Sequence, residues 1–180
     1  KLGYRFRSDH SDTEVIAPLY QQYGDDFVEH LNGMFAIALW DTQRQRLLVY
    51  RDRAGIKPLY FADLGGAFAF GSEIKALLVH PGVSRRPDPV ALHHYFTLKN
   101  IPAPASAFAQ IRQLRAGEML AYENGALSLR RWWRLRYAEN AAVTEQEAAA
   151  EIRRLLEDSV ALQMQSDVPF GAYLSGGVDS

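Results

Sequence analysis

Hydrophobic residues recur at three- and four-residue spacing in several stretches of the chain, as is typical of helices with one buried face. The first stretch runs from Val15 to Tyr23. It follows Ser11-Asp-Thr-Glu14, in which Ser and a Glu three residues later are typical of a helix start. Asp88-Pro89 and Thr144-Glu-Gln-Glu147 indicate two further helix starts. Helices are therefore predicted over residues 11–23, 25–31, 73–80, 89–96 and 145–160.

Short apolar runs bounded by turn residues predict β-strands between these helices. The run at residues 34–40 does not alternate with polar residues, so we expect both faces of that strand to be covered. The run at residues 168–174 leads into a Gly-rich loop and is expected to be a buried strand. Further strands are predicted over residues 46–51, 57–61, 67–70, 111–114, 118–122 and 127–135.

The composition of the chain changes after Tyr137, where Ala, Glu and Asn replace an Arg- and Trp-rich stretch. We predict a first domain of residues 1–137, a linker of residues 138–143 and the start of a second domain at residues 144–180. Strands flanked by amphipathic helices indicate a layered α+β fold for the first domain. The second domain opens as helix, strand and Gly-rich loop, which is how an α/β nucleotide-binding domain begins.

The charge balance argues against several classes of partner. The 180 residues carry 20 Lys and Arg against 21 Asp and Glu, and 48% are hydrophobic. We therefore expect a globular protein that binds neither nucleic acid nor a membrane. A cytoplasmic location is expected from the absence of Cys, which fits that compartment. The chain has no Cys, which excludes a disulfide framework, Cys-ligated zinc and a cysteine nucleophile among these residues.

The segment Ser175-Gly-Gly-Val-Asp-Ser180 carries the most specific chemical signal. The adjacent Gly176 and Gly177 let the backbone approach an anion closely, and successive N–H groups can form a concave site for phosphate. The hydroxyls of Ser175 and Ser180 can donate to phosphate oxygens, while Asp179 would act through Mg²⁺ or orient the loop. No Lys follows the glycines, so this is not a Walker A loop. A plain turn is the alternative, because Ser, Gly and Asp are common turn residues.

The chain resembles glutamine-dependent asparagine synthetases, which combine a class II glutamine amidotransferase domain with an ATP-pyrophosphatase domain. The resemblance spans essentially the whole chain and includes the loop at residues 175–180. It is carried by the segments Ser11-Asp-Thr-Glu-Val-Ile16, Leu31-Asn-Gly-Met-Phe-Ala-Ile-Ala-Leu-Trp-Asp41, Arg51-Asp-Arg-Ala-Gly-Ile-Lys-Pro-Leu-Tyr60, Gly71-Ser-Glu-Ile-Lys-Ala-Leu77 and Asp167-Val-Pro-Phe-Gly171.

The resemblance implies a fold and a reaction. Residues 1–137 would form an incomplete αββα sandwich of the N-terminal-nucleophile hydrolase type, and residues 144–180 the start of an α/β ATP-pyrophosphatase domain. Glutamine would be hydrolysed to glutamate and ammonia. The ammonia would attack an acyl-adenylate, most often β-aspartyl-AMP, that is formed from ATP, giving asparagine, AMP and pyrophosphate.

The resemblance also implies roles for individual residues. Asp12 would bind the α-amino group of glutamine, although by position alone it could be a helix cap. Leu174 would contact ATP together with Ser175, Gly176, Gly177, Asp179 and Ser180, although by pattern alone Leu174 is the last residue of a strand. The family's nucleophilic Cys has no counterpart in the chain and is expected upstream of Lys1, so these residues alone should not hydrolyse glutamine.

Two basic segments have structural interpretations that we favour over binding sites. Residues 51–58 are predicted to form a turn in which Arg51 and Asp52 pair and Gly55 supplies an unusual backbone angle. Residues 130–136 mix Arg with Trp, and we expect these arginines to stack on Trp or pair with carboxylates.

Three functional alternatives stay open on the sequence. A related amidotransferase, such as one associated with exopolysaccharide synthesis, would use another carboxylate acceptor in place of aspartate. An enzyme similar to β-lactam synthetases or lasso-peptide cyclases would use an internal amine. A regulatory glutamine-binding protein would need no pyrophosphate loop. Family members are often dimers, so a homodimer is possible.

Overall fold

The computed structural model describes residues 3–8, 11–138 and 142–178. The chain divides into two compact units, Lys1–Leu135 and Arg136–Ser180. This division lies beside the linker predicted at residues 138–143, part of which is outside the described residues. No helix of the described residues is long and apolar enough to cross a membrane.

The first unit opens with a helical segment. A 3₁₀ turn η1 (Asp12–Val15) leads into α1 (Ile16–Tyr23), and a second 3₁₀ stretch, η2 (Gly24–His30), follows. The predicted capping box at Ser11 is not formed: the Ser11 side chain makes no cap bond. The Glu14 carboxylate instead accepts from the backbone N–H groups of Arg7 at 2.9 Å and Ser8 at 3.3 Å.

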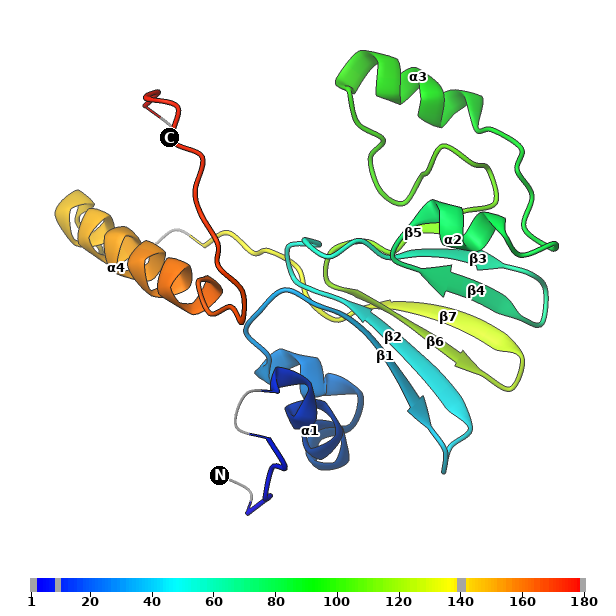
Figure 1. The fold of residues 1–180 in the computed structure, drawn as a ribbon, viewed down its shortest axis with the longest axis horizontal. Helices are drawn as coiled ribbons and strands as arrows, with labels where there is room; N and C mark the ends of the chain where they lie inside the picture. Colours follow the sequence, from blue (N-terminus) through cyan, green and yellow to red (C-terminus); the bar gives the residue numbers. More distant parts are fainter. Residues whose placement is uncertain (1–2, 9–10, 139–141, 179–180) are drawn as a thin grey trace. The chain divides into compact units, whose positions relative to one another are not determined.

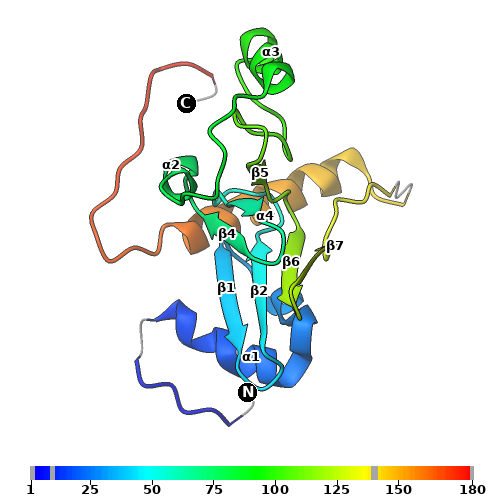
Figure 2. The same cartoon turned by 90° about the vertical axis from the view of Figure 1, so that its right-hand side faces the viewer.

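Two antiparallel sheets follow. The larger sheet contains β1 (Ala36–Asp41), β2 (Arg46–Arg51), β6 (Glu118–Glu123) and β7 (Ala126–Arg131), and the smaller contains β3 (Tyr60–Asp63), β4 (Phe68–Gly71) and β5 (Arg112–Gln113). The larger has the order β1-β2-β6-β7, and Figure 2 shows these strands side by side. The smaller has the order β4-β3-β5.

Successive side chains of a strand point to opposite faces of its sheet, and this alternation places hydrophobic clusters on both faces of the larger sheet. In β2, Leu48 and Tyr50 join Phe27 of η2 in one hydrophobic cluster, whereas Val49 joins Phe61 of β3 in a second cluster between the sheets. A third cluster lies under the short helix α2 (Ile74–Leu78) on the outer face of the smaller sheet. The resulting order is helices, sheet, sheet, helix, which Figure 1 shows from the side. The predicted α+β fold with an incomplete αββα sandwich is therefore confirmed.

The expectation that both faces of the strand at residues 34–40 are covered is wrong. Ile37 packs on the helical side, but Ala36, Ala38 and Trp40 are exposed. The reason is that β1 lies at the edge of its sheet. The cluster between the sheets takes side chains from β2, β6 and β7 but none from β1 among the described residues.

The strand predicted over residues 127–135 ends early, at Arg131. The N–H groups of Trp132 and Trp133 both donate to the carbonyl of Gly117, at 2.9 and 3.1 Å, which ends the regular pairing. Trp132 is buried, and Arg130 pairs with Asp26 at 2.9 Å, so the structural interpretation is confirmed for these two residues.

Two predicted helix starts have the expected caps. Asp88 accepts from the N–H groups of Val90 and Ala91 at the start of α3 (Pro89–Leu98). Thr144 and Glu147 form a capping box at the start of α4 (Glu145–Gln163).

The buried strand predicted at residues 168–174 is absent, and its apolar side chains are exposed. A strand needs a neighbour for its backbone hydrogen bonds, and the described part of the second unit contains no other strand.

Candidate functional site

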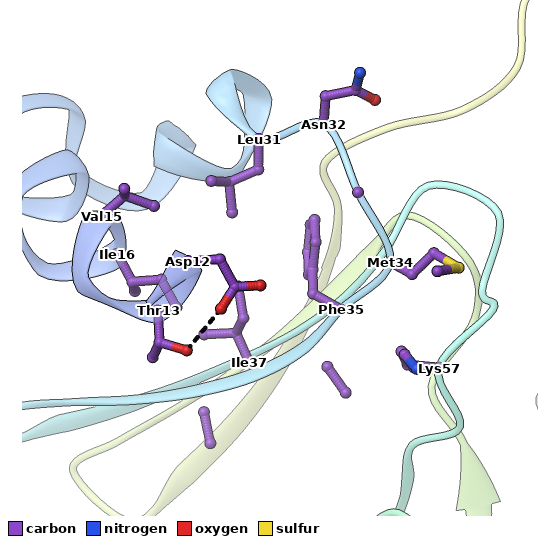
Figure 3. Close-up of a pocket in the computed structure, with 13 residues that line it drawn as sticks. Asp12, Thr13, Val15, Ile16, Leu31, Asn32, Met34, Phe35, Ile37 and Lys57 are labelled. Carbon is purple, nitrogen blue, oxygen red and sulfur yellow. Dashed lines mark hydrogen bonds between the residues drawn. The ribbon is translucent and has the colours of Figure 1, made fainter. Parts of the chain in front are cut away.

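A groove of about 700 Å³ lies in the first unit between the start of the helical segment and the exposed edge of β1. Figure 3 shows Asp12 on its helical side, with Phe35 and Lys57 on the other. Its lining residues are Asp12, Thr13, Val15, Ile16, Leu31, Asn32, Gly33, Met34, Phe35, Ala36, Ile37, Ala38 and Lys57.

Asp12 presents an exposed carboxylate to this groove. The hydroxyl of Thr13 donates to its Oδ1 at 3.2 Å. The residue at the N-cap position is Ser11 rather than Asp12. The carboxylate can therefore accept further hydrogen bonds, and it is the group best suited to an ammonium.

The other lining groups define what this groove can do. Most are apolar, while Asn32 supplies an amide and Lys57 an ammonium. Such a mixture suits a small polar molecule with charges of both signs. The lining residues include no Cys, so they can bind and orient a substrate but supply no thiol nucleophile.

The turn behind Lys57 is built around Asp52, whose side chain is 1% exposed. Its Oδ1 accepts from the N–H groups of Ala54 at 3.1 Å and Ile56 at 2.9 Å. Its Oδ2 accepts from Lys57 at 3.0 Å and from Phe35 at 3.3 Å. A buried carboxylate with four donors is satisfied, so the predicted structural turn at residues 51–58 is confirmed. The predicted pair of Arg51 with Asp52 is not formed, because the Asp52 carboxylate binds backbone N–H groups and the Arg51 guanidinium binds backbone carbonyls.

Arg51 completes that turn from the other side. Its Nε donates to the carbonyl of Lys57 at 2.8 Å, and its terminal nitrogens donate to the carbonyls of Gly55 and Leu114. Gly55 has φ +68°, as the prediction of an unusual angle required. Burial lowers the pKa of the Arg51 guanidinium, and the charge of Asp52 opposes that shift.

The predicted phosphate loop lies in the second unit. Leu174 is 80% exposed, Gly176 has φ +78° and the N–H of Gly177 donates to Ser175 Oγ at 3.3 Å. Asp179 and Ser180 lie outside the described residues. The loop thus has the left-handed glycine and the hydroxyl that a phosphate site uses, while its role in binding stays a prediction.

Asp12 is predicted from the sequence as a site residue, whereas no site role is predicted there for Asn32, Gly33, Phe35 or Lys57. Phe35 and Lys57 are brought together by the carboxylate of Asp52, which no local pattern shows. The one available signal was the Asn32-Gly33 break between a helical stretch and an apolar run.

The chain has weak similarity to a solved structure of an amidotransferase. The chain is 21% identical to a glutamine phosphoribosylpyrophosphate amidotransferase from B. subtilis, with a TM-score of 0.47, over 73% of this chain and 24% of the other.

Curated relatives are more similar. Asparagine synthetase [glutamine-hydrolyzing] 3 of Bacillus subtilis is 38% identical over 99% of this chain and 29% of its own length. Asparagine synthetase B [glutamine-hydrolyzing] of Escherichia coli is 38% identical over 98% of this chain and 27% of its own length. The chain thus spans less than a third of the length of these relatives.

Two protein families match the chain. Residues 151–180 match the family described as asparagine synthase. Residues 1–133, which include the groove, match the family described as glutamine amidotransferase domain. Both matches agree with the resemblance to glutamine-dependent asparagine synthetases that the five segments carry. The chain therefore belongs to the glutamine amidotransferase domain family, in the combination with an asparagine synthase segment that characterises these synthetases.

Proposed function

We propose that the chain is part of a cytoplasmic glutamine-hydrolysing asparagine synthetase. In this proposal the first unit binds glutamine, and ammonia from its side chain is transferred to a carboxylate, that of aspartate, which ATP activates. The names of the relatives and the two family matches support the proposal.

The observation that carries the proposal is the position of Asp12. Its carboxylate lines the groove and is not used as a helix cap. A glutamine bound there would place its α-ammonium against Asp12, in a charge-assisted contact. The apolar lining would surround the methylene groups of the substrate.

The resemblance implies that a Cys thiol is the nucleophile of the hydrolysis, and the chain has no Cys. We assign the nucleophile to a Cys of the full-length enzyme that these 180 residues do not include. The contribution of the described residues is then to bind glutamine and to fix its orientation, which alone accounts for a large part of many rate enhancements.

The second unit would contact ATP. Leu174, Ser175, Gly176 and Gly177 would hold its phosphates, and Asp179 and Ser180 would continue that site, with Mg²⁺ at Asp179. The left-handed Gly176 and the open backbone beside it fit a phosphate group. When bound, ATP supplies the activation of the acceptor carboxylate.

The test compares glutamine with ammonia as nitrogen donor in the full-length enzyme. Asp12→Asn removes the charge that faces the α-ammonium, so KM for glutamine should rise about tenfold or more. Synthesis from ammonia should be unchanged, because free ammonia bypasses the groove.

Asp63→Asn is the matched control for this test. Asp63 accepts from the N–H of Gly65 in the β3–β4 turn and does not line the groove. If Asp12→Asn lowered synthesis from glutamine and synthesis from ammonia equally, Asp12 would have a structural role and the proposed glutamine site would be refuted.

A further inference from the structure

One wall of the groove is a short segment, Leu31–Phe35, that carries Asn32, Gly33 and Met34 between its ends. The middle residues are exposed and lie outside the helices and strands. The two ends of this wall are both bound by consecutive residues of one turn, Asp52 and Arg53.

Asp52 holds the Phe35 end. The backbone of Phe35 is bound twice: its N–H donates to Asp52 Oδ2 at 3.3 Å, and its carbonyl accepts from the N–H of Asp52 at 3.0 Å. The same Oδ2 accepts from the N–H of Lys57 at 3.0 Å. One carboxylate oxygen therefore ties together two residues that line the groove from different segments.

Arg53 holds the Leu31 end. Its guanidinium donates to the carbonyl of Leu31 at 2.5 Å and to that of Glu29 at 2.9 Å. It lies over the ring of Trp132, 5.5 Å from the centroid. Trp132 in turn stacks on Phe35 at 6.2 Å between centroids and donates from Nε1 to the carbonyl of Arg51 at 3.2 Å.

These contacts restrict how the wall can move. The Asp52 carboxylate cannot rotate toward solvent without losing bonds on both oxygens, and it is almost fully buried. The Phe35 ring is supported by Trp132 and faces the groove in Figure 3. The wall is thus fixed at both ends while Asp12 comes from a separate helical segment.

We propose that Asp52 and Arg53 are positioning residues of the glutamine site. They set the distance between the Leu31–Phe35 wall and Asp12, and so determine how tightly glutamine is held in the groove. This inference rests on the proposed function. A binding group displaced by about 1 Å can cost on the order of a hundredfold in rate, so loosening either end should be measurable.

The experiment uses the full-length enzyme with Asp52→Asn, Arg53→Ala and the control Asp63→Asn. Asp52→Asn replaces one carboxylate oxygen by an amide NH₂. Each oxygen accepts from two N–H groups and an NH₂ cannot accept, so two hydrogen bonds are lost. Arg53→Ala frees the Leu31 carbonyl and leaves the Asp52 carboxylate in place. Glutamine-dependent synthesis, ammonia-dependent synthesis and melting temperature are measured for each variant.

We expect KM for glutamine to rise between about tenfold and a hundredfold in both variants. The kcat with ammonia should stay within about twofold of the wild type. A general loss of folded protein would instead lower the rates with glutamine and with ammonia together. Asp63→Asn should match the wild type in both reactions. If Asp52→Asn does not fold, Arg53→Ala decides, since Arg53 is only partly buried.

Two outcomes overturn the inference. An unchanged KM for glutamine in both variants, or in Arg53→Ala when Asp52→Asn does not fold, shows that the wall does not set binding. An equal fall of both reactions in Arg53→Ala shows a role in stability alone. A wild-type enzyme that releases no glutamate from glutamine would refute the proposed function itself, and this is seen before any variant is compared.

Discussion

Gly117 shows how a single residue without a side chain lets distant segments meet. It has φ +65°, and its carbonyl accepts from the N–H groups of Trp132 and Trp133. Its own N–H donates to the carbonyl of Asp52 at 2.9 Å. A Cβ at this position would lie 2.3 Å from the carbonyl oxygen of Trp133, which is backbone and cannot rotate away. Gly117 thus connects the turn behind the groove to the tryptophan segment.

Gly117→Ala should destabilise the first unit much more than Gly125→Ala. Gly125 also has a positive φ, +78°, but no atom lies within 4 Å of the position that a Cβ would take there. The backbone strain should cost about 1–2 kcal/mol at either site. The clash at Gly117 should add about 1–3 kcal/mol. Urea unfolding of both variants measures the difference, and equal free energies of unfolding would contradict the close contact at Gly117.

At this scale the sequence predicts local chemistry better than distant contacts. Asp12 could be predicted because its motif and helix position are local. The turn at residues 51–58 could be predicted as structural because Asp, Gly and Pro are common turn residues. That Asp52 also holds Phe35, across 17 positions of the chain, follows from tertiary packing and has no local signature.

Several secondary-structure elements of the first unit lie close to where their hydrophobic periods predict them, whereas β3 begins only at Tyr60, within the strand predicted at residues 57–61. The strand predicted at residues 46–51 is β2 with the same bounds, and the helix predicted at 73–80 is the shorter α2. Two of the failed predictions share one cause: the strand at residues 168–174 and the covered second face of β1 both need a neighbouring element. Periodicity shows which residues are suited to burial, but pairing partners decide whether burial occurs.

Tyr50 links two of these elements, and its ionisation should lower the stability of the fold at alkaline pH. Its hydroxyl, on β2, donates to the carbonyl of Asp25 in η2 at 3.0 Å. Burial, with the nearby charge of Asp25, raises the pKa of Tyr50 well above its ordinary value of 10.0. The folded state therefore holds this proton more tightly than the unfolded state. The contribution of Tyr50 to stability should therefore be constant below about pH 10 and be lost as the pH rises above it.

Tyr50→Phe tests this link between β2 and η2. It removes one hydrogen bond, so the free energy of unfolding near pH 7 should fall by about 0.5–1.5 kcal/mol. It also removes the buried hydroxyl, so the loss of stability above pH 10 should become shallower. Some loss of stability above pH 10 should remain in this variant, because burial and Asp41 raise the pKa of Tyr20 as well. An unchanged alkaline slope in unfolding titrations would contradict the assignment to Tyr50.

On the scale of the whole molecule, the two units carry separate parts of the proposed chemistry. The groove and its supporting turn lie within Lys1–Leu135, and the proposed ATP contacts lie within Arg136–Ser180. Each activity should therefore respond to changes in its own unit. A division into two units could be predicted from the composition and the motifs, whereas the fold of the second unit could not.

Asp179→Ala in the full-length enzyme should separate the two activities. Loss of the carboxylate proposed to organise Mg²⁺ and pyrophosphate should reduce ATP-dependent pyrophosphate release by about 10²–10³-fold. Glutamine hydrolysis should persist, because it belongs to the other unit. Pyrophosphate and glutamate are measured together in wild type and variant. Unchanged pyrophosphate release would remove Asp179 from the ATP site, and loss of both activities with a lower melting temperature would make it structural.

Because β2 lies between two hydrophobic clusters, insertions and deletions within this strand should be poorly tolerated. Leu48 and Tyr50 face one cluster while Leu47 and Val49 face the other, and both neighbouring strands are fixed in register. Inserting one residue in β2 would exchange these pairs and disturb both clusters at once. Insertions and deletions should therefore accumulate in the polar β1–β2 turn at residues 42–45, which makes that turn the natural place to attach a tag or reporter domain.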